Sequence, residues 1–320
     1  MADRRYAILG TGALGGFYGG RLARAGADVH FLLHSDYEHV RDHGLRVDSV
    51  DGDFHLPRVH AYARAEDMPP CDVVCVCLKT TANHLLPDLL PPVVADGGVV
   101  LVLQNGLGTE EQVAGIVGPG RVMGGLCFLC SNKIGPGHIR HLDYGYVTLA
   151  DFDPAGGPCG VTDRMWAVGT DFERAGIRVR YAADLVLARW KKLIWNVPFN
   201  GLTVVLRAAT DRIMADPHTR ALAEELMREV AAGASAVAGR VIPEDFIRSQ
   251  LADTARMKPY RPSMLLDYEA ARPMEVEAIC GVALRAAREA ACPTPRMAVL
   301  YQLLKFLDAA PSGRAQKQTV

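Results

Sequence analysis

Continuous apolar runs dominate the first half of the chain. The clearest are four to six residues long and lie at 6–9, 29–33, 73–78 and 99–103. Runs of this kind are typical of strands that are buried on both faces of a parallel sheet. Further strands are expected over 121–130 and 177–181, and the alternation over 138–150 predicts an added hairpin or edge strands. Helices are expected over 14–25 and 161–175, so strands and helices alternate.

Helical periodicity replaces this pattern after residue 184. Asp216 and Pro217 have the form of a helix N-cap followed by proline at the first helical position. Leu222, Leu226 and Val230 then lie on one face of a helix. Further helices are predicted over 185–206, 243–255, 275–291 and 294–309. The second half is therefore predicted to be entirely helical.

The first predicted strand leads into a glycine-rich turn with the spacing GxGxxG, Gly10-Thr11-Gly12-Ala13-Leu14-Gly15. Together with the helix and strand that follow, it forms a strand–turn–helix–strand unit of about thirty residues. Gly10 and Gly12 allow a tight turn and close approach of a pyrophosphate, and Gly15 allows the helix to pack closely on the strand. The first N–H groups of the helix favour the phosphates. The predicted cofactor contacts in this turn are Gly10, Gly12, Ala13, Leu14 and Gly15.

The predicted fold class is therefore α/β, with two domains. Residues 1–183 are expected to form an N-terminal, Rossmann-type doubly wound sheet that binds a dinucleotide. Residues 184–320 are expected to form an all-α C-terminal domain that supplies substrate-binding and catalytic groups. Reactive groups are expected in the cleft between such domains.

The residues after the second strand bear on the choice of nucleotide. An acidic residue at this point would bind the ribose 2′-hydroxyl of NAD, but His34 and Ser35 come first and Asp36 comes late. His34 and Ser35 can both donate to a 2′-phosphate, with Arg41 as a further candidate. The sequence favours NADP, and NAD is the alternative if Asp36 reaches the ribose.

Polar side chains follow two of the buried strands. Lys79 follows the third apolar run, and the turn Gln104-Asn105-Gly106 follows the fourth. Ligands of open parallel sheets bind beyond the carboxyl ends of the strands. Lys79 and Asn105 are therefore candidates for contact with the nicotinamide or the substrate. The structural alternatives are a solvated strand end for Lys79 and a plain turn residue for Asn105.

A polar stripe crosses the long helix at the start of the second half. Lys192, Asn196 and Asn200 recur every four residues and so share one face of an otherwise apolar helix. If this face is buried, the three side chains need polar partners. Pro198 removes one backbone hydrogen bond and can kink the helix. The alternative for Lys192 is a surface lysine, a role that suits Lys191 better because it points about 100° away.

Composition and charge exclude several classes of function. With 320 residues, 49% of them hydrophobic and 22% charged, the chain can bury sizeable cores. A formal charge of −1 gives no electrostatic reason to expect nucleic acid or an anionic membrane as a partner. The absence of a signal-peptide pattern and of a membrane-length apolar run predicts a cytoplasmic protein. Cys127 and Cys130 have CxxC spacing without a second pair, so no metal site is predicted.

In their order and spacing these motifs resemble the ketopantoate reductase family over almost the whole chain. The matching features are the glycine turn, Lys79, the turn 104–106, the segment 192–196 with Asn200 and Thr203, and Ser263-Met264 with Asp267 and Glu275. The resemblance implies NADPH-dependent reduction of a 2-keto acid in pantothenate biosynthesis, with ketopantoate as the default substrate. Lys192 matches the catalytic lysine of the family, Glu275 the glutamate that works with it, and Lys79 a lysine near the nicotinamide. The positions that match substrate contacts are Asn105, Asn196, Asn200 and Ser263.

The chemistry of such a reduction suits these residues. Hydride addition to a ketone produces an alkoxide, and the ammonium of Lys192 can polarise the carbonyl and then donate a proton. Glu275 is expected near a helix start, where a carboxylate is also favoured by the helix dipole, and Glu277 competes for the same role. Ser263 has a structural alternative as the cap of a helix that begins at Met264.

Two other functions stay open at this point. Trp195 and Phe199 are bulky beside the polar stripe, and 258–262 is rich in proline, which leaves a related reductase for a different bulky 2-keto acid. The second alternative is a non-catalytic protein that senses NADP(H), although sensing alone needs neither Lys192 nor Glu275. The expected partner is a small 2-keto acid, and helical second domains of this kind often form homodimers.

Overall fold

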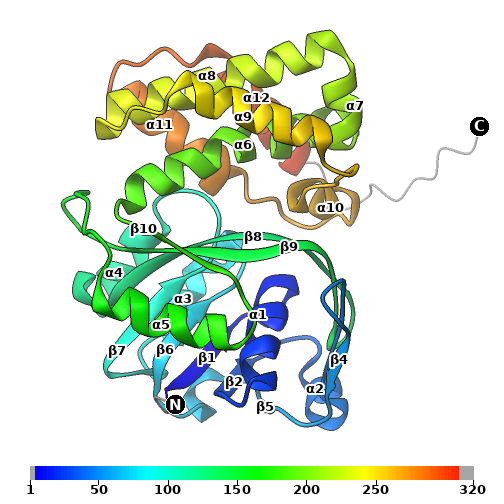
Figure 1. Cartoon of the computed structure of the whole chain (residues 1–320), viewed down its shortest axis with the longest axis vertical. Helices are drawn as coiled ribbons and strands as arrows, with labels where there is room; N and C mark the ends of the chain where they lie inside the picture. The colour runs from blue at the N-terminus through cyan, green and yellow to red at the C-terminus, as the bar shows by residue number, and fades with distance from the viewer. Residues whose placement is uncertain (1–3, 310–320) are drawn as a thin grey trace, which may run out of the picture. The chain divides into compact units, whose positions relative to one another are not determined.

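The computed structural model describes residues 4–309, and these form two compact units (Figure 1). Unit 1 consists of the chain up to Asn105 together with residues 109–185. Unit 2 consists of the chain from Val186 onward together with the loop Gly106–Gly108. Each unit has a hydrophobic core of its own, as a separate domain requires.

The loop Gly106–Gly108 interrupts unit 1 and packs within unit 2. The backbone N–H of Leu107 donates to the carbonyl of Ala278 at 3.1 Å. Gly106 has φ +96°, and a Cβ atom there would collide with the same carbonyl, so only glycine fits this close approach. A contact between segments so far apart in the chain leaves no local pattern, and a single boundary near residue 183 does not foresee it.

Ten strands form one mixed sheet in the described part of unit 1. In chain order they are β1 (Arg5–Leu9), β2 (Asp28–Leu32), β3 (Leu45–Ser49), β4 (Phe54–Leu56), β5 (His60–Tyr62), β6 (Cys71–Val76), β7 (Val94–Val102), β8 (Val122–Gly135), β9 (His138–Asp151) and β10 (Val179–Ala182). Their spatial order is β4-β3-β9-β8-β7-β6-β1-β2-β5, with β10 paired to β9. From β8 to β5 in this order all neighbours are parallel. The parallel sheet predicted from the apolar runs is thus confirmed.

Helices cover both faces of this sheet, as in a doubly wound fold. The helices of unit 1 are α1 (Ala13–Arg24), α2 (Tyr37–His43), α3 (Leu86–Leu89), α4 (Thr109–Val117) and α5 (Asp163–Arg174). One core joins α1 and α5 to the face that bears Ile8, and a second core joins α3 and α4 to the face that bears Leu9 (Figure 1). Side chains that alternate along β1 therefore belong to two cores. The helices predicted over 14–25 and 161–175 are confirmed as α1 and α5.

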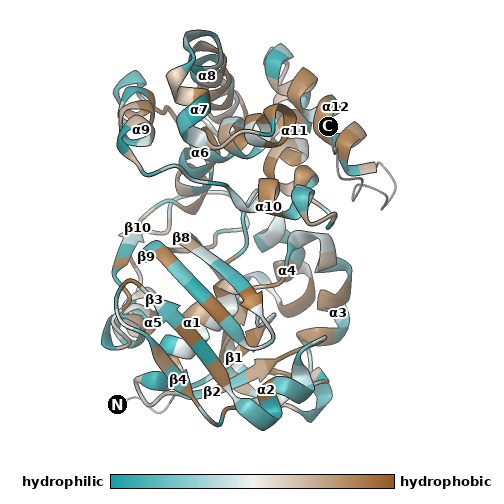
Figure 2. Ribbon diagram, turned by 90° about the vertical axis from the view of Figure 1, so that its right-hand side faces the viewer, coloured by the Kyte–Doolittle hydropathy of each residue, from teal (hydrophilic) through white to brown (hydrophobic). Residues whose placement is uncertain are grey.

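The β8–β9 hairpin is the largest addition to the parallel sheet. Its two strands of 14 residues pair antiparallel, and Figure 2 shows apolar and polar bands alternating along them. An added hairpin is confirmed, although residues 138–150 form only its second strand and β8 forms the first; edge strands are wrong. The strand β9 lies inside the sheet, between β8 on one side and β3 and β10 on the other. The sequence pattern does not predict β3, β4 and β5, because residues 45–62 contain no continuous apolar run.

Unit 2 is helical in its described part, as predicted. Its helical segments are α6 (Leu185–Leu206), α7 (Thr210–Ala215), α8 (Pro217–Ala238), α9 (Glu244–Arg256), α10 (Ser263–Glu269), the π-helical turn η4 (Glu277–Gly281), α11 (Val282–Glu289) and α12 (Pro295–Ala309). The predicted cap of α8 is confirmed: the carboxylate of Asp216 accepts from the N–H groups of His218 and Thr219, at 3.1 and 2.9 Å. Within residues 4–309 no helix is both long and apolar enough to span a membrane.

Candidate functional site

The glycine turn between β1 and α1 has the close packing that its sequence predicts. Gly10 has φ +99°, and a Cβ atom there would lie 2.8 Å from the backbone nitrogen of Leu78. A Cβ atom on Gly15 would lie 2.7 Å from the side chain of Ile8. Glycine is therefore required at position 10 for the turn to approach the backbone of Leu78, and at position 15 for the helix to pack closely on β1.

Gly12 differs from both, because a Cβ atom there would have no heavy atom within 4 Å. Gly16 donates to the carbonyl of Gly12 at 2.8 Å, so the N–H groups of Ala13, Leu14 and Gly15 precede the hydrogen-bond ladder of α1. The open space beside the Cα atom of Gly12 and the three N–H groups at the helix N-terminus suit the pyrophosphate of a dinucleotide. The turn therefore fits the cofactor expected for it.

The segment after β2 exposes two polar residues and buries a third. His34 and Ser35 are exposed, whereas Asp36 is only 6% exposed. Oδ2 of Asp36 accepts from the backbone N–H of Gly137 at 2.9 Å and pairs with Nζ of Lys133 at 2.6 Å. The carboxylate is thus engaged by the β8–β9 hairpin, whereas His34 and Ser35 remain exposed.

Lys79 and Asn105 follow the carboxyl ends of the neighbouring parallel strands β6 and β7. Lys79 is exposed and precedes a short 3₁₀ turn, whereas Asn105 is half-buried. The buried side chain of Gln104 donates from Nε2 to the carbonyl of Leu78 at 2.8 Å and to Oδ1 of Asn83 at 2.7 Å. The two strand ends are therefore tied together, at the edge of the sheet where ligands of parallel sheets bind.

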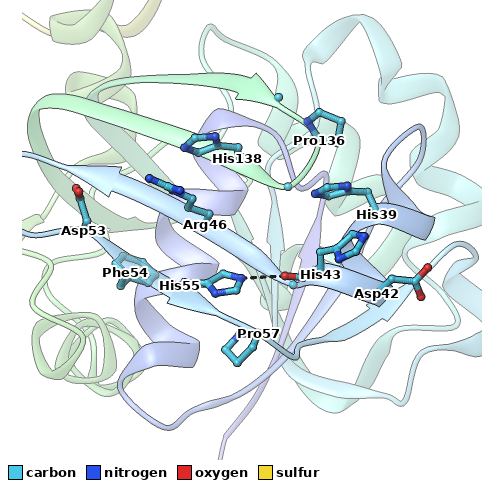
Figure 3. A pocket seen from close by; sticks show the side chains of 13 residues that line it. His39, Asp42, His43, Arg46, Asp53, Phe54, His55, Pro57, Pro136 and His138 are labelled. Atoms are coloured by element: carbon cyan, nitrogen blue, oxygen red, sulfur yellow. Dashed lines mark hydrogen bonds between the residues drawn. The ribbon is translucent and has the colours of Figure 1, made fainter.

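A separate cavity of about 810 Å³ opens in unit 1 beside α2 (Figure 3). Histidines from three elements line it: His39 and His43 of α2, whose rings are 4.8 Å apart, His55 of β4 and His138 of β9. None of the residues predicted to bind the cofactor lines this cavity. The part of the chain that the structure describes holds no group of three or more His, Cys, Asp or Glu side chains suited to a metal ion.

The polar stripe of α6 is buried. Lys192, Asn196 and Asn200 are 8%, 7% and 4% exposed. Lys191 is half-buried instead, and its Nζ lies 5.4 Å from the centre of the Phe246 ring. The alternative of a surface lysine thus describes Lys191 and does not describe Lys192.

Asn200 carries a buried acceptor. Its Oδ1 is shielded from solvent and has no hydrogen-bond partner among the described residues. The hydroxyl of Thr203, one turn along the helix, is used elsewhere, since it donates to the carbonyl of Phe199 at 2.6 Å. An unsatisfied acceptor in the interior costs about 1–3 kcal/mol, so this oxygen is suited to a donor from outside the chain. The helix itself continues through Pro198 without a break.

Two carboxylates that compete for one role have different surroundings. Glu275 is 6% exposed and lies just before the helix start. Glu277 is exposed, and its carboxylate binds Arg285 at 2.8 Å, Tyr301 at 2.7 Å and Lys305 at 3.0 Å. Burial raises the pKa of Glu277, but these hydrogen bonds outweigh it and lower the pKa to about 2. Glu277 thus belongs to a surface ion cluster, whereas Glu275 is buried.

Ser263 begins α10 without capping it. The N-cap position is Pro262, and no side-chain hydrogen bond caps the helix. The capping alternative for Ser263 is therefore wrong, because its hydroxyl is not committed to the helix N-terminus. The residue is half-buried.

The bulky neighbours of the stripe belong to the core of unit 2. Phe199 is fully buried, and Trp195 packs against the same core with its ring centre 5.1 Å from that of Phe199. The indole N–H of Trp195 donates to Oγ1 of Thr254 at 3.0 Å. Both aromatic residues therefore have a structural role in packing α6.

Both units match known proteins. The family model described as "Ketopantoate reductase PanE/ApbA" matches residues 6–154, and the model of its C-terminal part matches residues 184–308. A curated 2-dehydropantoate 2-reductase from Nostoc sp. is 58% identical over 308 residues, 96% of either chain. Solved structures of 2-dehydropantoate 2-reductases from Geobacter metallireducens and Methylococcus capsulatus are similar, with TM-scores of 0.90 and 0.85 and identities of 42% and 34%. They cover 94% and 95% of this chain, and 99% and 96% of their own lengths.

Proposed function

Because the chain belongs to the ketopantoate reductase family of NAD(P)-dependent oxidoreductases, we propose that it reduces 2-dehydropantoate (ketopantoate) to pantoate. The proposed hydride donor is NADPH, and the proposed proton donor is Lys192. The observation that carries this proposal is the buried stripe of α6, whose lysine and two asparagines are at most 8% exposed. A lysine is rarely buried to this degree unless its charge is compensated. Its burial therefore favours a specific role, and in a reductase of this class that role is the donation of a proton to the reduced carbonyl oxygen.

NADPH is proposed to bind unit 1, where it supplies the hydride. The residues that hold it in this proposal are Gly10, Gly12, Ala13, Leu14, Gly15, His34, Ser35, Lys79 and Asn105. NADPH is favoured over NADH because the carboxylate of Asp36 is engaged by Lys133 and Gly137, which draws it away from a ribose 2′-hydroxyl. The exposed His34 and Ser35 can donate to a 2′-phosphate instead.

The substrate is proposed to bind Asn196, Asn200 and Ser263 of unit 2 and Asn105. Once its carboxyl group is ionised, ketopantoate has a single O–H donor, the 4-hydroxyl group. The buried Oδ1 of Asn200, which has no partner among the described residues, is suited to accept from that hydroxyl. The amide N–H groups of asparagine are suited to the substrate carboxylate. This favours ketopantoate over 2-keto acids that lack a hydroxyl group.

The proposed roles of Lys192 and Glu275 follow from the charge that the reaction creates. Hydride addition at C2 turns the keto oxygen into an alkoxide. The ammonium of Lys192 polarises this oxygen by a hydrogen bond and then transfers a proton to it, which yields the 2-hydroxy acid and a neutral amine. Glu275, a carboxylate that is 6% exposed, is proposed to favour the ammonium form of Lys192 between turnovers.

The test is NADPH oxidation, followed by absorbance, with a panel of 2-keto acids. Ketopantoate is expected to be the best substrate. Its analogue without the 4-hydroxyl group, 3,3-dimethyl-2-oxobutanoate, is expected to have a kcat/KM at least about tenfold lower. Faster reduction of a different bulky keto acid would favour the related-reductase alternative. NADPH binding without reduction of any keto acid would favour the sensing alternative.

Two further predictions accompany this proposal. A homodimer is expected from the helical second domain, and light scattering on the purified protein measures it directly. A cytoplasmic location is expected from the sequence, and fractionation of the cells that produce the protein measures it.

A further inference from the structure

We infer that Lys133 sets the preference for NADPH over NADH by masking the charge of Asp36. The inference rests on the proposed NADPH-dependent function and adds a positioning residue to it. Lys133 belongs to β8, and Asp36 lies between β2 and α2. The juxtaposition of the two therefore arises only in the folded chain.

Asp36 is the first acidic residue after β2, near the point where an acidic side chain would bind the ribose of NAD. It occupies the N-cap position of α2, but its side chain caps no N–H group of that helix. Its Oδ2 lies 2.6 Å from Nζ of Lys133 and accepts from the N–H of Gly137 at 2.9 Å. With an exposed fraction of 6%, this carboxylate is held by the hairpin and hidden from solvent.

The hairpin tip is itself anchored. The carbonyl of Gly137 accepts from the backbone N–H of Arg46 at 2.8 Å, which joins the tip to β3. Gly137 has φ +58°, and a Cβ atom there would lie 2.8 Å from the carbonyl oxygen of Gly44, so the tip has little freedom to shift. Lys133 therefore meets Asp36 from a fixed backbone, with its side chain 30% exposed.

The charge of Asp36 has opposite effects on the binding of NADPH and of NADH. A free carboxylate at this point would repel a 2′-phosphate and could accept a hydrogen bond from a 2′-hydroxyl group. The ammonium of Lys133 neutralises this charge and holds the oxygen that would otherwise turn toward the ribose. Without Lys133, a nearly buried carboxylate keeps a single backbone donor, a costly state that favours rotation of the side chain to solvent.

The experiment measures the dissociation constants of NADPH and NADH directly, by fluorescence titration of the purified protein. Lys133→Met is expected to lower the preference for NADPH, expressed as the ratio of the two constants, by at least about tenfold. Lys133→Arg keeps the charge and is expected to retain the preference. Arg140→Met is the matched control, because it removes one positive charge from the same hairpin, 3.7 Å from Asp48, without touching Asp36. It should change the ratio by less than about twofold.

The isosteric change Asp36→Asn completes a double-mutant cycle. It removes the charge that Lys133 masks, so Lys133→Met should alter the ratio by less than about threefold in this background. If Lys133→Met does not fold, Asp36→Asn alone is informative. It should tighten NADPH binding by about two- to threefold, because the ammonium of Lys133 is then no longer neutralised.

Three results would overturn the inference. One is a ratio for folded Lys133→Met within about threefold of the wild-type value. Another is a full effect of Lys133→Met in the Asp36→Asn background, which would mean that Lys133 acts without Asp36. The third is unchanged NADPH binding by Asp36→Asn. A wild-type protein that prefers NADH would instead refute the NADPH part of the proposed function, and the variant ratios would still test whether Lys133 controls the preference.

Discussion

Replacement of Asn200 by leucine should have different effects on the stability of the free enzyme and on its kcat/KM for ketopantoate. Leucine has the branching of asparagine but no polar atoms. Oδ1 of Asn200 is buried and has no partner among the described residues, and the residue is 4% exposed. Removing most buried polar groups breaks a hydrogen bond, but at this atom the free enzyme has none to lose.

The expected magnitudes have opposite signs for stability and catalysis. Removing an unsatisfied acceptor recovers about 1–3 kcal/mol, and leucine, which is close to asparagine in shape, costs about 1 kcal/mol in crowding. The free energy of unfolding, measured by urea denaturation, is therefore expected to stay level or to rise by up to about 2 kcal/mol. For ketopantoate, kcat/KM is expected to fall about 10–100-fold, because the substrate hydroxyl loses its acceptor.

The analogue 3,3-dimethyl-2-oxobutanoate provides the control, because it lacks the hydroxyl group. Asn200→Leu should change its kcat/KM by less than about threefold. Equal losses with both substrates would show that Asn200 does not bind the hydroxyl. A free enzyme destabilised by more than about 1 kcal/mol would show that Oδ1 has a partner in solution, and the reasoning from burial would fail.

The other four predictions each compare a variant with a neighbouring variant or with the wild-type protein. Lys192→Ala should lower kcat by at least about 100-fold. The control variant Lys191→Ala, which changes the neighbouring residue of the same helix, should keep kcat within about twofold of the wild-type value. A loss of less than about tenfold in folded Lys192→Ala would reject the proton-donor role. Glu275→Ala should cause a large loss of kcat with an altered pH profile, whereas Glu277→Ala should leave kcat near the wild-type value; the reverse result would show that Glu275 is misassigned. The pKa of Glu277 is about 2 in the folded protein and ordinarily 4.5. The ionised carboxylate therefore stabilises the fold above pH 4.5, and this stabilisation is lost as the pH falls toward 2. Unfolding of the wild-type protein and of Glu277→Ala, followed during acid titration, measures the difference. Burial lowers the pKa of His141 below its ordinary 6.5. As the pH falls, the unfolded chain therefore takes up this proton before the folded protein does, and the free energy of unfolding should decrease at pH values below about 6.5. Denaturant unfolding at a series of pH values should show a smaller decrease for His141→Gln.

Features set by local sterics and by burial on both faces could be predicted from the sequence. Strands β6 and β7 are recognisable because a strand covered by helices on both faces has no polar positions to spare. Gly15 is predictable to the residue, because a side chain there would collide with Gly10 and Ile8 of the same strand–turn–helix unit. Gly10 is predictable from the turn itself, which needs its positive φ, although the atoms that a side chain there would meet belong to Leu78. The stripe of α6 follows from helical spacing alone.

Features set by contacts between distant segments could not be predicted. The loop Gly106–Gly108 belongs to unit 2 through Ala278, and no composition change marks it. Arg41, a candidate for a 2′-phosphate contact, pairs with its neighbour Asp42 at 2.8 Å. The link between Asp36 and Lys133 likewise leaves no trace in the spacing of either residue. These contacts decide which of several polar side chains near a strand end is free to meet a ligand.

Asp36 and Asn200 show how the same rule of buried polar groups leads to different functions. A buried polar atom needs a partner, and for Asp36 the fold supplies two of them, Lys133 and Gly137. A carboxylate satisfied in this way is not available to a ligand, so in the inference above it affects cofactor preference only because it no longer presents a free negative charge and acceptor. For Oδ1 of Asn200 the described residues supply no partner, so in the proposed function its desolvation is offset only when the substrate supplies a donor. In that proposal the free enzyme carries the cost of the unsatisfied oxygen, and binding of a 2-keto acid with a hydroxyl group removes this cost.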